Sequence, residues 1–190
     1  MRKLIVEEWI SLDGYVTDKH GALDFFTDIT PEKNTYSDAD QLKFLETVDT
    51  IILGRKTYEL FVEFWPTATT EQEVIADRLN ELPKLVFSNT LSATPWGKWN
   101  NAQLADGELI EEIKKLKQMP GKNMVLWGSI SIAQQLMENN LVDEYHLQVC
   151  PVLNGDGRKF FEPGYTNNLK VLEVRQYNTG TVYLSYAPKM

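Results

Sequence analysis

Several residue types are scarce in this chain of 190 residues, which has one cysteine and two histidines. A single cysteine excludes an internal disulfide and any zinc site built from several cysteines. Cys150 lies in an apolar run, and we interpret it as an inert strand residue rather than as a reactive thiol. His20 and His146 are far apart and belong to no motif with metal-ligand spacing, so the sequence predicts no metal site.

Positive charge and long apolar runs are also scarce. Lysine and arginine number 19 against 27 acidic residues, which gives a net charge of −8. Nucleic acids and anionic membranes need a basic face, so this charge argues against both partners. No apolar run approaches the roughly 20 residues that span a bilayer. Glu7 and Glu8 interrupt the first apolar stretch, which excludes a signal-peptide core, and we expect a cytoplasmic protein.

The composition is that of an ordinary globular chain. Hydrophobic residues make up 43% of it and charged residues 24%, enough apolar mass for a full core. The chain contains no internal repeat, low-complexity segment or linker-like stretch. We therefore expect residues 1–190 to form a single domain.

Short apolar runs alternate with segments of helical period. Continuous apolar runs of this kind are typical of strands covered by helices on both faces of a largely parallel sheet. The predicted strands are residues 4–10, 50–53, 84–87, 124–127 and 144–149.

The segments between the strands carry helix signals. A capping box at Thr70-Glu71-Gln72-Glu73 predicts a helix over 70–82 that Pro83 ends. Asp106 is placed to cap a second helix through 116, and a third is expected over about 130–139. Residues 170–177 and 181–187 flank Asn178-Thr179-Gly180 and predict a hairpin at one edge. The fold class is therefore α/β, a mixed sheet with a parallel centre and a C-terminal antiparallel hairpin.

Ligands of parallel α/β sheets bind at the carboxyl ends of the strands, where loops lead into helices. Gly54-Arg55-Lys56-Thr57 follows the second predicted strand and combines a close backbone turn, two cations and a hydroxyl. That set suits a phosphorylated ligand. The alternative is a glycine turn with two solvated cations. The spacing is not that of a Walker A loop.

Two further strand exits are polar. Trp127-Gly128-Ser129-Ile130-Ser131 follows the fourth strand and is a plausible anion-binding turn, although a serine cap is also common for structural reasons. Phe87-Ser88-Asn89-Thr90 follows the third. Three polar segments of this kind, each directly after a predicted strand of one sheet, favour a dinucleotide site. The absence of a G-x-G-x-x-G fingerprint argues against a Rossmann domain.

These residues carry a family resemblance. Ser11-Leu12-Asp13-Gly14 and the turns at residues 54–57 and 127–129 resemble the signature turns of the dihydrofolate-reductase-like superfamily. Residues 141–144, 151–157 and 160–161 resemble the reductase domain of the bacterial bifunctional riboflavin-biosynthesis deaminase/reductase, so that the match covers nearly the whole chain. The zinc signature of the deaminase half does not occur in this sequence.

The resemblance implies NADPH as the hydride donor. Arg55 would face the adenosine 2′-phosphate with Ser88 beside it, which favours NADPH over NADH because a guanidinium binds a phosphate monoester well. Gly54, Lys56 and Thr57 would sit near the pyrophosphate, covered by Gly128, Ser129, Ile130 and Ser131. The family's Gly-Gly pair at this turn is joined by a cis peptide, so we expect a cis bond between Trp127 and Gly128. The alternative is a trans turn capped by Ser129.

The substrate side is less specific. The resemblance places Asp13 near the nicotinamide or substrate, although an Asp-Gly pair also forms turns. Asp38 or Asp40 would hold a pterin as in dihydrofolate reductases, although acids at a helix N-terminus are ordinary dipole partners. Several aromatic residues are candidates to stack on a planar heterocycle, and the alternative is that they belong to the core. They are Trp9, Phe25, Phe26, Tyr58, Phe64 and Trp65.

The sequence therefore predicts an NADPH-dependent reductase of a small heterocycle, resembling a riboflavin-precursor aminopyrimidine or a pterin. Two alternatives stay open: a non-catalytic nucleotide-binding module, and a reductase of an unrelated carbonyl substrate. A homodimer is expected from the resemblance, and because residues 141–161 are apolar for a sheet edge.

Overall fold

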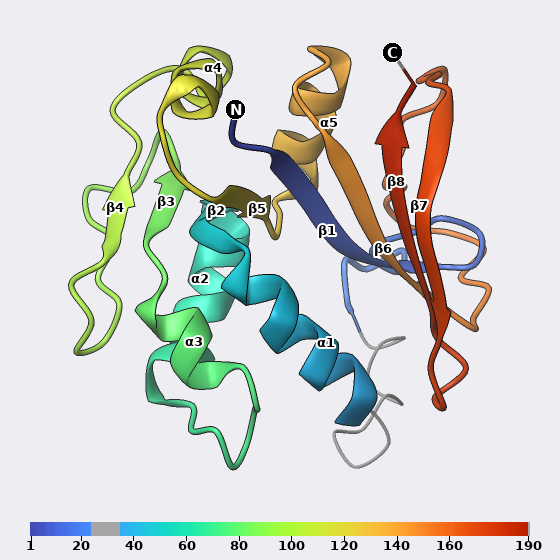
Figure 1. Cartoon of the computed structure of the whole chain (residues 1–190), viewed down its shortest axis with the longest axis horizontal. Helices are drawn as coiled ribbons and strands as arrows, with labels where there is room; N and C mark the ends of the chain where they lie inside the picture. The colour runs from blue at the N-terminus through green and yellow to red at the C-terminus, as the bar shows by residue number, and fades with distance from the viewer. Residues whose placement is uncertain (24–34, 190) are drawn as a thin grey trace.

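The computed structural model describes residues 1–23 and 35–189. In these ranges eight strands form one sheet (Figure 1). The strands are β1 (Leu4–Ser11), β2 (Val48–Gly54), β3 (Lys84–Phe87), β4 (Ala102–Leu104), β5 (Asn123–Leu126), β6 (Glu144–Cys150), β7 (Leu169–Gln176) and β8 (Val182–Pro188). The order across the sheet is β4-β3-β2-β5-β1-β6-β8-β7. The strands from β4 to β6 are parallel, and β8 and β7 continue the sheet antiparallel. The predicted parallel centre and terminal hairpin are confirmed.

Helices cover both faces of the parallel part (Figure 1). They are α1 (Thr35–Glu46), α2 (Arg55–Phe64), α3 (Ala76–Glu81), α4 (Leu109–Gln118) and α5 (Ile130–Glu138), with a short 3₁₀ turn, η3 (Trp65–Thr67), after α2. None of the helices in the described ranges is long and apolar enough to cross a membrane.

Alternation along the strands divides the core into two clusters. On β2, Ile52 packs with α4 and α5 on one face, whereas Ile51 and Leu53 pack with α1, α2 and α3 on the other. Met124 and Val125 of β5 divide in the same way. Each central strand is therefore apolar on both faces, which explains the continuous apolar runs in the sequence.

The predicted helix over 70–82 is wrong in its first half, because α3 begins at Ala76. The Thr69 N–H donates to Gln72 Oε1 at 3.0 Å, and the N–H of Glu73 donates to the Thr69 carbonyl at 2.9 Å, which closes a separate turn before the helix. The predicted cap of α4 is also misplaced, since Glu108 rather than Asp106 precedes its first residue.

Two features of the sheet depart from the sequence prediction. β4 is an additional three-residue strand that was not predicted. The segment around β6 is not a sheet edge, because β6 pairs with β1 on one side and β8 on the other. The apolar character of residues 144–150 thus reflects burial inside the sheet, and it gives no support for a dimer through this strand.

Candidate active site

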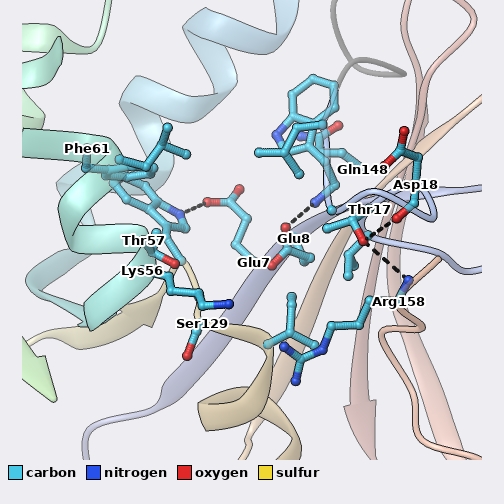
Figure 2. A pocket seen from close by; sticks show the side chains of 18 of the residues that line it. Glu7, Glu8, Thr17, Asp18, Lys56, Thr57, Phe61, Ser129, Gln148 and Arg158 are labelled. Carbon is cyan, nitrogen blue, oxygen red and sulfur yellow. Dashed lines mark hydrogen bonds between the residues drawn. The ribbon is translucent and has the colours of Figure 1, made fainter. Parts of the chain in front are cut away.

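A cavity of about 1140 Å³ opens at the carboxyl ends of β1, β2, β5 and β6 (Figure 2). Its walls come from the loop after β1, the starts of α2 and α5, the side of α1, and the loop after β6. Small-molecule sites usually have volumes of roughly 300–1,000 Å³. This cavity therefore has room for more than one small ligand group.

The two glycine turns predicted from the sequence meet at one wall of this cavity. The N–H of Gly54 donates to the Gly128 carbonyl at 2.9 Å. A Cβ on Gly54 would lie 2.4 Å from Ser129 Oγ, and one on Gly128 would lie 2.6 Å from Thr57 Oγ1. Gly128 also has a φ of +96°, which side-chain-bearing residues rarely adopt. The turns pack too closely for a side chain at either glycine.

Two helix N-termini open onto the same wall. α2 begins directly after Gly54 and α5 directly after Ser129. The first N–H groups of a helix have no partner within the helix and carry partial positive charge, so they attract anions. Lys56 adds a full positive charge beside Thr57 and Ser129 (Figure 2). The two helix N-termini and Lys56 give this wall a positive electrostatic character.

The carboxyl groups of Glu7 and Glu8 on β1 enter the cavity. Neither residue was predicted from the sequence as a site residue. Glu7 Oε2 accepts hydrogen bonds from Gln41 Nε2 at 2.7 Å and from Trp127 Nε1 at 2.5 Å. Burial raises the pKa of the Glu7 carboxyl. Glu8 follows it on the strand, and burial raises its pKa to about 8. Both carboxyls hold protons more tightly than free glutamate does.

Aromatic rings stand beside this carboxyl pair. The ring of Phe61 lies 6.2 Å from that of Trp127 and 6.0 Å from that of Trp65. All three side chains line the cavity. They provide a surface on which a planar ring can stack.

The family model described as the RibD C-terminal domain matches residues 2–183. The chain belongs to the RibD C-terminal domain family. The resemblance to the riboflavin-biosynthesis reductase domain is thereby confirmed.

Three similar proteins illustrate how far this likeness extends. The uncharacterized protein YyaP of Bacillus subtilis is 31% identical over 97% of this chain and 94% of its own length. A putative riboflavin biosynthesis protein from Shewanella sp. PV-4 is 25% identical, with a TM-score of 0.78 over 99% of both chains. Dihydrofolate reductase from Enterococcus faecalis, solved in complex with NADP(H), is 14% identical, with a TM-score of 0.57 over 99% of this chain and 97% of its own. The last comparison shows the shared fold.

The RibD-type cofactor residues predicted from the sequence divide into two groups. Lys56, Thr57, Gly128, Ser129 and Ile130 line the cavity, and Gly54 packs directly behind them. Arg55, Ser88 and Ser131 are not among the described residues that line it.

The side chains of the second group contact neighbouring residues. The Arg55 guanidinium donates to both carboxylate oxygens of Glu59 at 2.9 Å, and its side chain is 42% exposed. Ser88 Oγ accepts the N–H groups of Thr90 and Leu91 at 3.2 and 3.0 Å. The Ser131 hydroxyl lies 3.0 Å from that of Ser129. Arg55 is therefore paired with an exposed partner, Glu59, whereas the Ser88 side chain closes its own turn.

The cis peptide expected between Trp127 and Gly128 lies instead between Gly128 and Ser129, so that prediction is wrong by one residue. Trp127 follows the last residue of β5 and is still hydrogen-bonded to the sheet, because its N–H donates to the Ile52 carbonyl at 3.3 Å, so the turn itself starts at Gly128. The Trp127 indole turns toward Glu7 and forms part of the cavity wall.

Asp13 is not among the described residues that line the cavity. Its carboxylate accepts the N–H of Asn154 at 3.0 Å, the hydroxyl of Ser11 at 2.7 Å and the N–H of Gly155 at 2.8 Å. These hydrogen bonds, the Asn154 N–H above all, lower the pKa of Asp13 to about 2. The arrangement favours the turn-forming alternative, in which Asp13 ties the loop after β1 to the loop after β6.

The structure separates the two acids considered on α1. Asp38 lines the cavity, and burial raises its pKa. Asp40 faces Arg175, with which it forms an ion pair, and accepts the hydroxyl of Tyr177 at 3.2 Å. Asp38 is the acid placed to contact a ligand in this cavity.

The aromatic residues singled out in the sequence also separate. Trp9 and Trp65 line the cavity. Tyr58 is buried and its hydroxyl donates to the Pro95 carbonyl at 2.6 Å, whereas Phe64 is 43% exposed. Phe25 and Phe26 lie outside the described residues.

One sequence signal could have revealed the carboxyl pair of β1. Glu7 and Glu8 are adjacent acids in a strand that was predicted to be covered on both faces. A buried charge is costly unless it is paired, so acids at such positions indicate a functional cavity.

Proposed function

We propose that this chain is an NADPH-dependent reductase of a small heterocyclic substrate, similar to a riboflavin-precursor aminopyrimidine or a pterin. The observation that carries the proposal is the joined pair of glycine turns, at which two helix N-termini and Lys56 face one large cavity. Membership of the RibD C-terminal domain family supports it. The NADP(H) complex of the dihydrofolate reductase that shares this fold is consistent with the same cofactor.

The residues present fit a dinucleotide. Gly54 and Gly128 form a cradle that a Cβ would fill, and Lys56, Thr57 and the 128–131 turn would hold the pyrophosphate. Arg55 would bind the 2′-phosphate at the rim beside Ser88. Its exposed ion pair with Glu59 is worth only a few tenths of a kcal/mol, so a phosphate dianion can displace Glu59.

The bound cofactor would supply the hydride, and the chain's own residues would position the acceptor. Phe61, Trp65 and Trp127 form the stacking surface for a planar ring. Asp38 lines the same cavity and offers its carboxyl oxygens to ring N–H groups. Closure of the site by these apolar rings excludes water from the reacting atoms.

The choice of NADPH over NADH is tested by replacing Arg55 with Ala and titrating both cofactors by fluorescence. Loss of a hydrogen-bonded charge partner should weaken NADPH by about 1.5–3 kcal/mol and NADH much less. Lys114→Ala is the matched control, because Lys114 forms a similar exposed ion pair with Glu111 on the remote helix α4. Equal losses for the two cofactors, or none, would contradict the assignment. Substrate-dependent oxidation of NADPH then separates a reductase from a binding module.

A further inference from the structure

Glu8 lies on β1, in the interior of the sheet, and lines the cavity. It pairs with Leu147 of β6 in the parallel ladder, so its side chain leaves β1 on the face opposite to that of Glu7. In Figure 2 its carboxyl lies between the wall of Lys56 and Ser129 and the wall of Thr17 and Arg158. A ligand that spans the cavity passes this carboxyl.

The carboxyl groups of Glu7 and Glu8 differ in their hydrogen-bond partners. Two side-chain donors, Gln41 and Trp127, bond to Glu7. Glu8 Oε1 accepts the N–H of Trp9 at 3.2 Å, and within the described part of the chain its carboxyl has no side-chain donor. Glu8 therefore keeps a carboxyl oxygen for a ligand, whereas Glu7 is committed to the wall.

The surroundings of Glu8 favour its protonated form. Burial raises the pKa of this carboxyl to about 8, the nearby charge of Glu7 adds to the effect, and the N–H of Trp9 opposes it. The other charged groups around the cavity are Lys56 on α2, Asp38 on α1, Glu73 before α3, and Asp18, Lys19, His20, Asp156 and Arg158 in the loops after β1 and β6.

We propose that Glu8 is the acid of the reduction and donates its carboxyl proton to the substrate heteroatom, whose neighbouring carbon would accept the hydride that bound NADPH would supply. The inference rests on the proposed reductase function. The π bond of the C=N or C=O group breaks, a C–H bond forms from the hydride, and an N–H or O–H bond forms from the Glu8 proton. The products are the reduced substrate, NADP⁺ and the Glu8 carboxylate, which regains a proton from solvent.

This assignment has a consequence that needs no substrate. The nicotinamide ring is cationic in NADP⁺ and neutral in NADPH, while both nucleotides carry the same phosphates. A cation next to Glu8 favours its carboxylate. Binding of NADP⁺ should therefore release a proton from Glu8, and binding of NADPH should not.

The test measures proton release with a pH indicator when each nucleotide binds the full chain in weakly buffered solution at pH 7. A carboxyl with a pKa of about 8 is about nine-tenths protonated there, so NADP⁺ should release up to about 0.9 proton per chain more than NADPH. Glu8→Gln should abolish the difference, and Glu8→Asp should retain it. Glu111→Gln, which alters an exposed acid on α4, is the control and should behave as wild type.

The outcomes distinguish the two proposals. Equal proton release for the two nucleotides in wild type, or an undiminished difference in Glu8→Gln, overturns the role of Glu8 while leaving cofactor binding intact. Failure of both nucleotides to bind wild type in a fluorescence titration overturns the reductase function itself, and the inference falls with it. If Glu8→Gln does not fold, the comparison of NADP⁺ with NADPH on wild type and on Glu8→Asp still decides the matter.

Discussion

Replacement of Gly54 by Ala should separate the two turns that form the proposed phosphate-binding wall. The added Cβ would lie 2.4 Å from Ser129 Oγ, 2.9 Å from the Ser129 backbone nitrogen and 3.0 Å from Ile132 Cδ1. The hydroxyl can rotate away, but the backbone nitrogen belongs to the start of α5 and cannot move alone. The substitution therefore pushes α5 away from α2.

The expected cost follows from this contact. The φ of Gly54 is −85°, so alanine adopts the backbone conformation without strain. Alanine gains about 0.4–1 kcal/mol by restricting the unfolded chain, and a similar amount is lost because it is a poor residue before a helix. Overpacking remains, at about 1–3 kcal/mol of unfolding free energy. Displacement of one phosphate-binding N–H group should also weaken NADPH at least about tenfold.

Urea denaturation and NADPH titration of the same preparations provide the measurement. Gly107→Ala is the matched control, because its nearest neighbour would be Glu112 Oε2 at 3.7 Å. It should change the unfolding free energy by less than about 0.5 kcal/mol. Adding Ser129→Gly to Gly54→Ala should recover part of the stability, since it removes the 2.4 Å contact and leaves the 2.9 Å one. A Gly54→Ala protein as stable and as tight for NADPH as wild type would refute the reasoning.

Two further predictions concern the loop after β1 and the edge of the sheet. The pKa of Asp13 is about 2 in the folded chain against an ordinary value of 3.8, so its stabilising effect is present above pH 4 and lost as the pH falls toward 2. Asp13→Asn should lower the urea midpoint at pH 6 and flatten the decline between pH 4 and 2; an unchanged pH dependence would show that the carboxylate does not tie the loops together. We also propose that the chain is a homodimer that buries the exposed apolar side chains of the edge strand β7, Val171 and Val174, which are 52% and 58% exposed. Light scattering should give twice the mass of 21.8 kDa at micromolar concentration and the monomer mass for Val174→Lys; a wild-type monomer would contradict the proposal.

Strand positions were predictable because the apolar runs of the parallel strands are short and continuous. Residues 84–87 were predicted to the residue, and the strand at 4–10 to within one. β4 was not predicted, because its three residues are not buried and form no apolar run. The start of α3 was not predicted correctly, because the Thr69 N–H donates to the Gln72 side-chain oxygen and closes a turn where the capping-box pattern predicts a helix.

The two glycine turns, at residues 54–57 and 127–131, were also predictable one at a time as polar segments that follow a strand. A glycine, a cation and a hydroxyl directly after a strand are visible in the sequence as an anion-binding pattern, whatever the position of that strand in the sheet. Their convergence depended on β2 and β5 being neighbours in the sheet, although β3 and β4 lie between them in sequence. The hydrogen bond from Gly54 to Gly128 exists only because of that order.

The sequence by itself determined the fold class, the positions of the glycine turns and the polar character of the strand ends, because these depend on periodicity and on local backbone preferences. The tertiary structure decided which acids face the ligand. Asp38 and Asp40 are two residues apart on one helix, yet Asp38 lines the cavity while Asp40 pairs with Arg175. Asp13 is held as a carboxylate by backbone N–H groups, whereas Glu8 is held toward its acid form by burial. Desolvation and hydrogen bonding are properties of the assembled site, so no pattern of residues along the chain contains them.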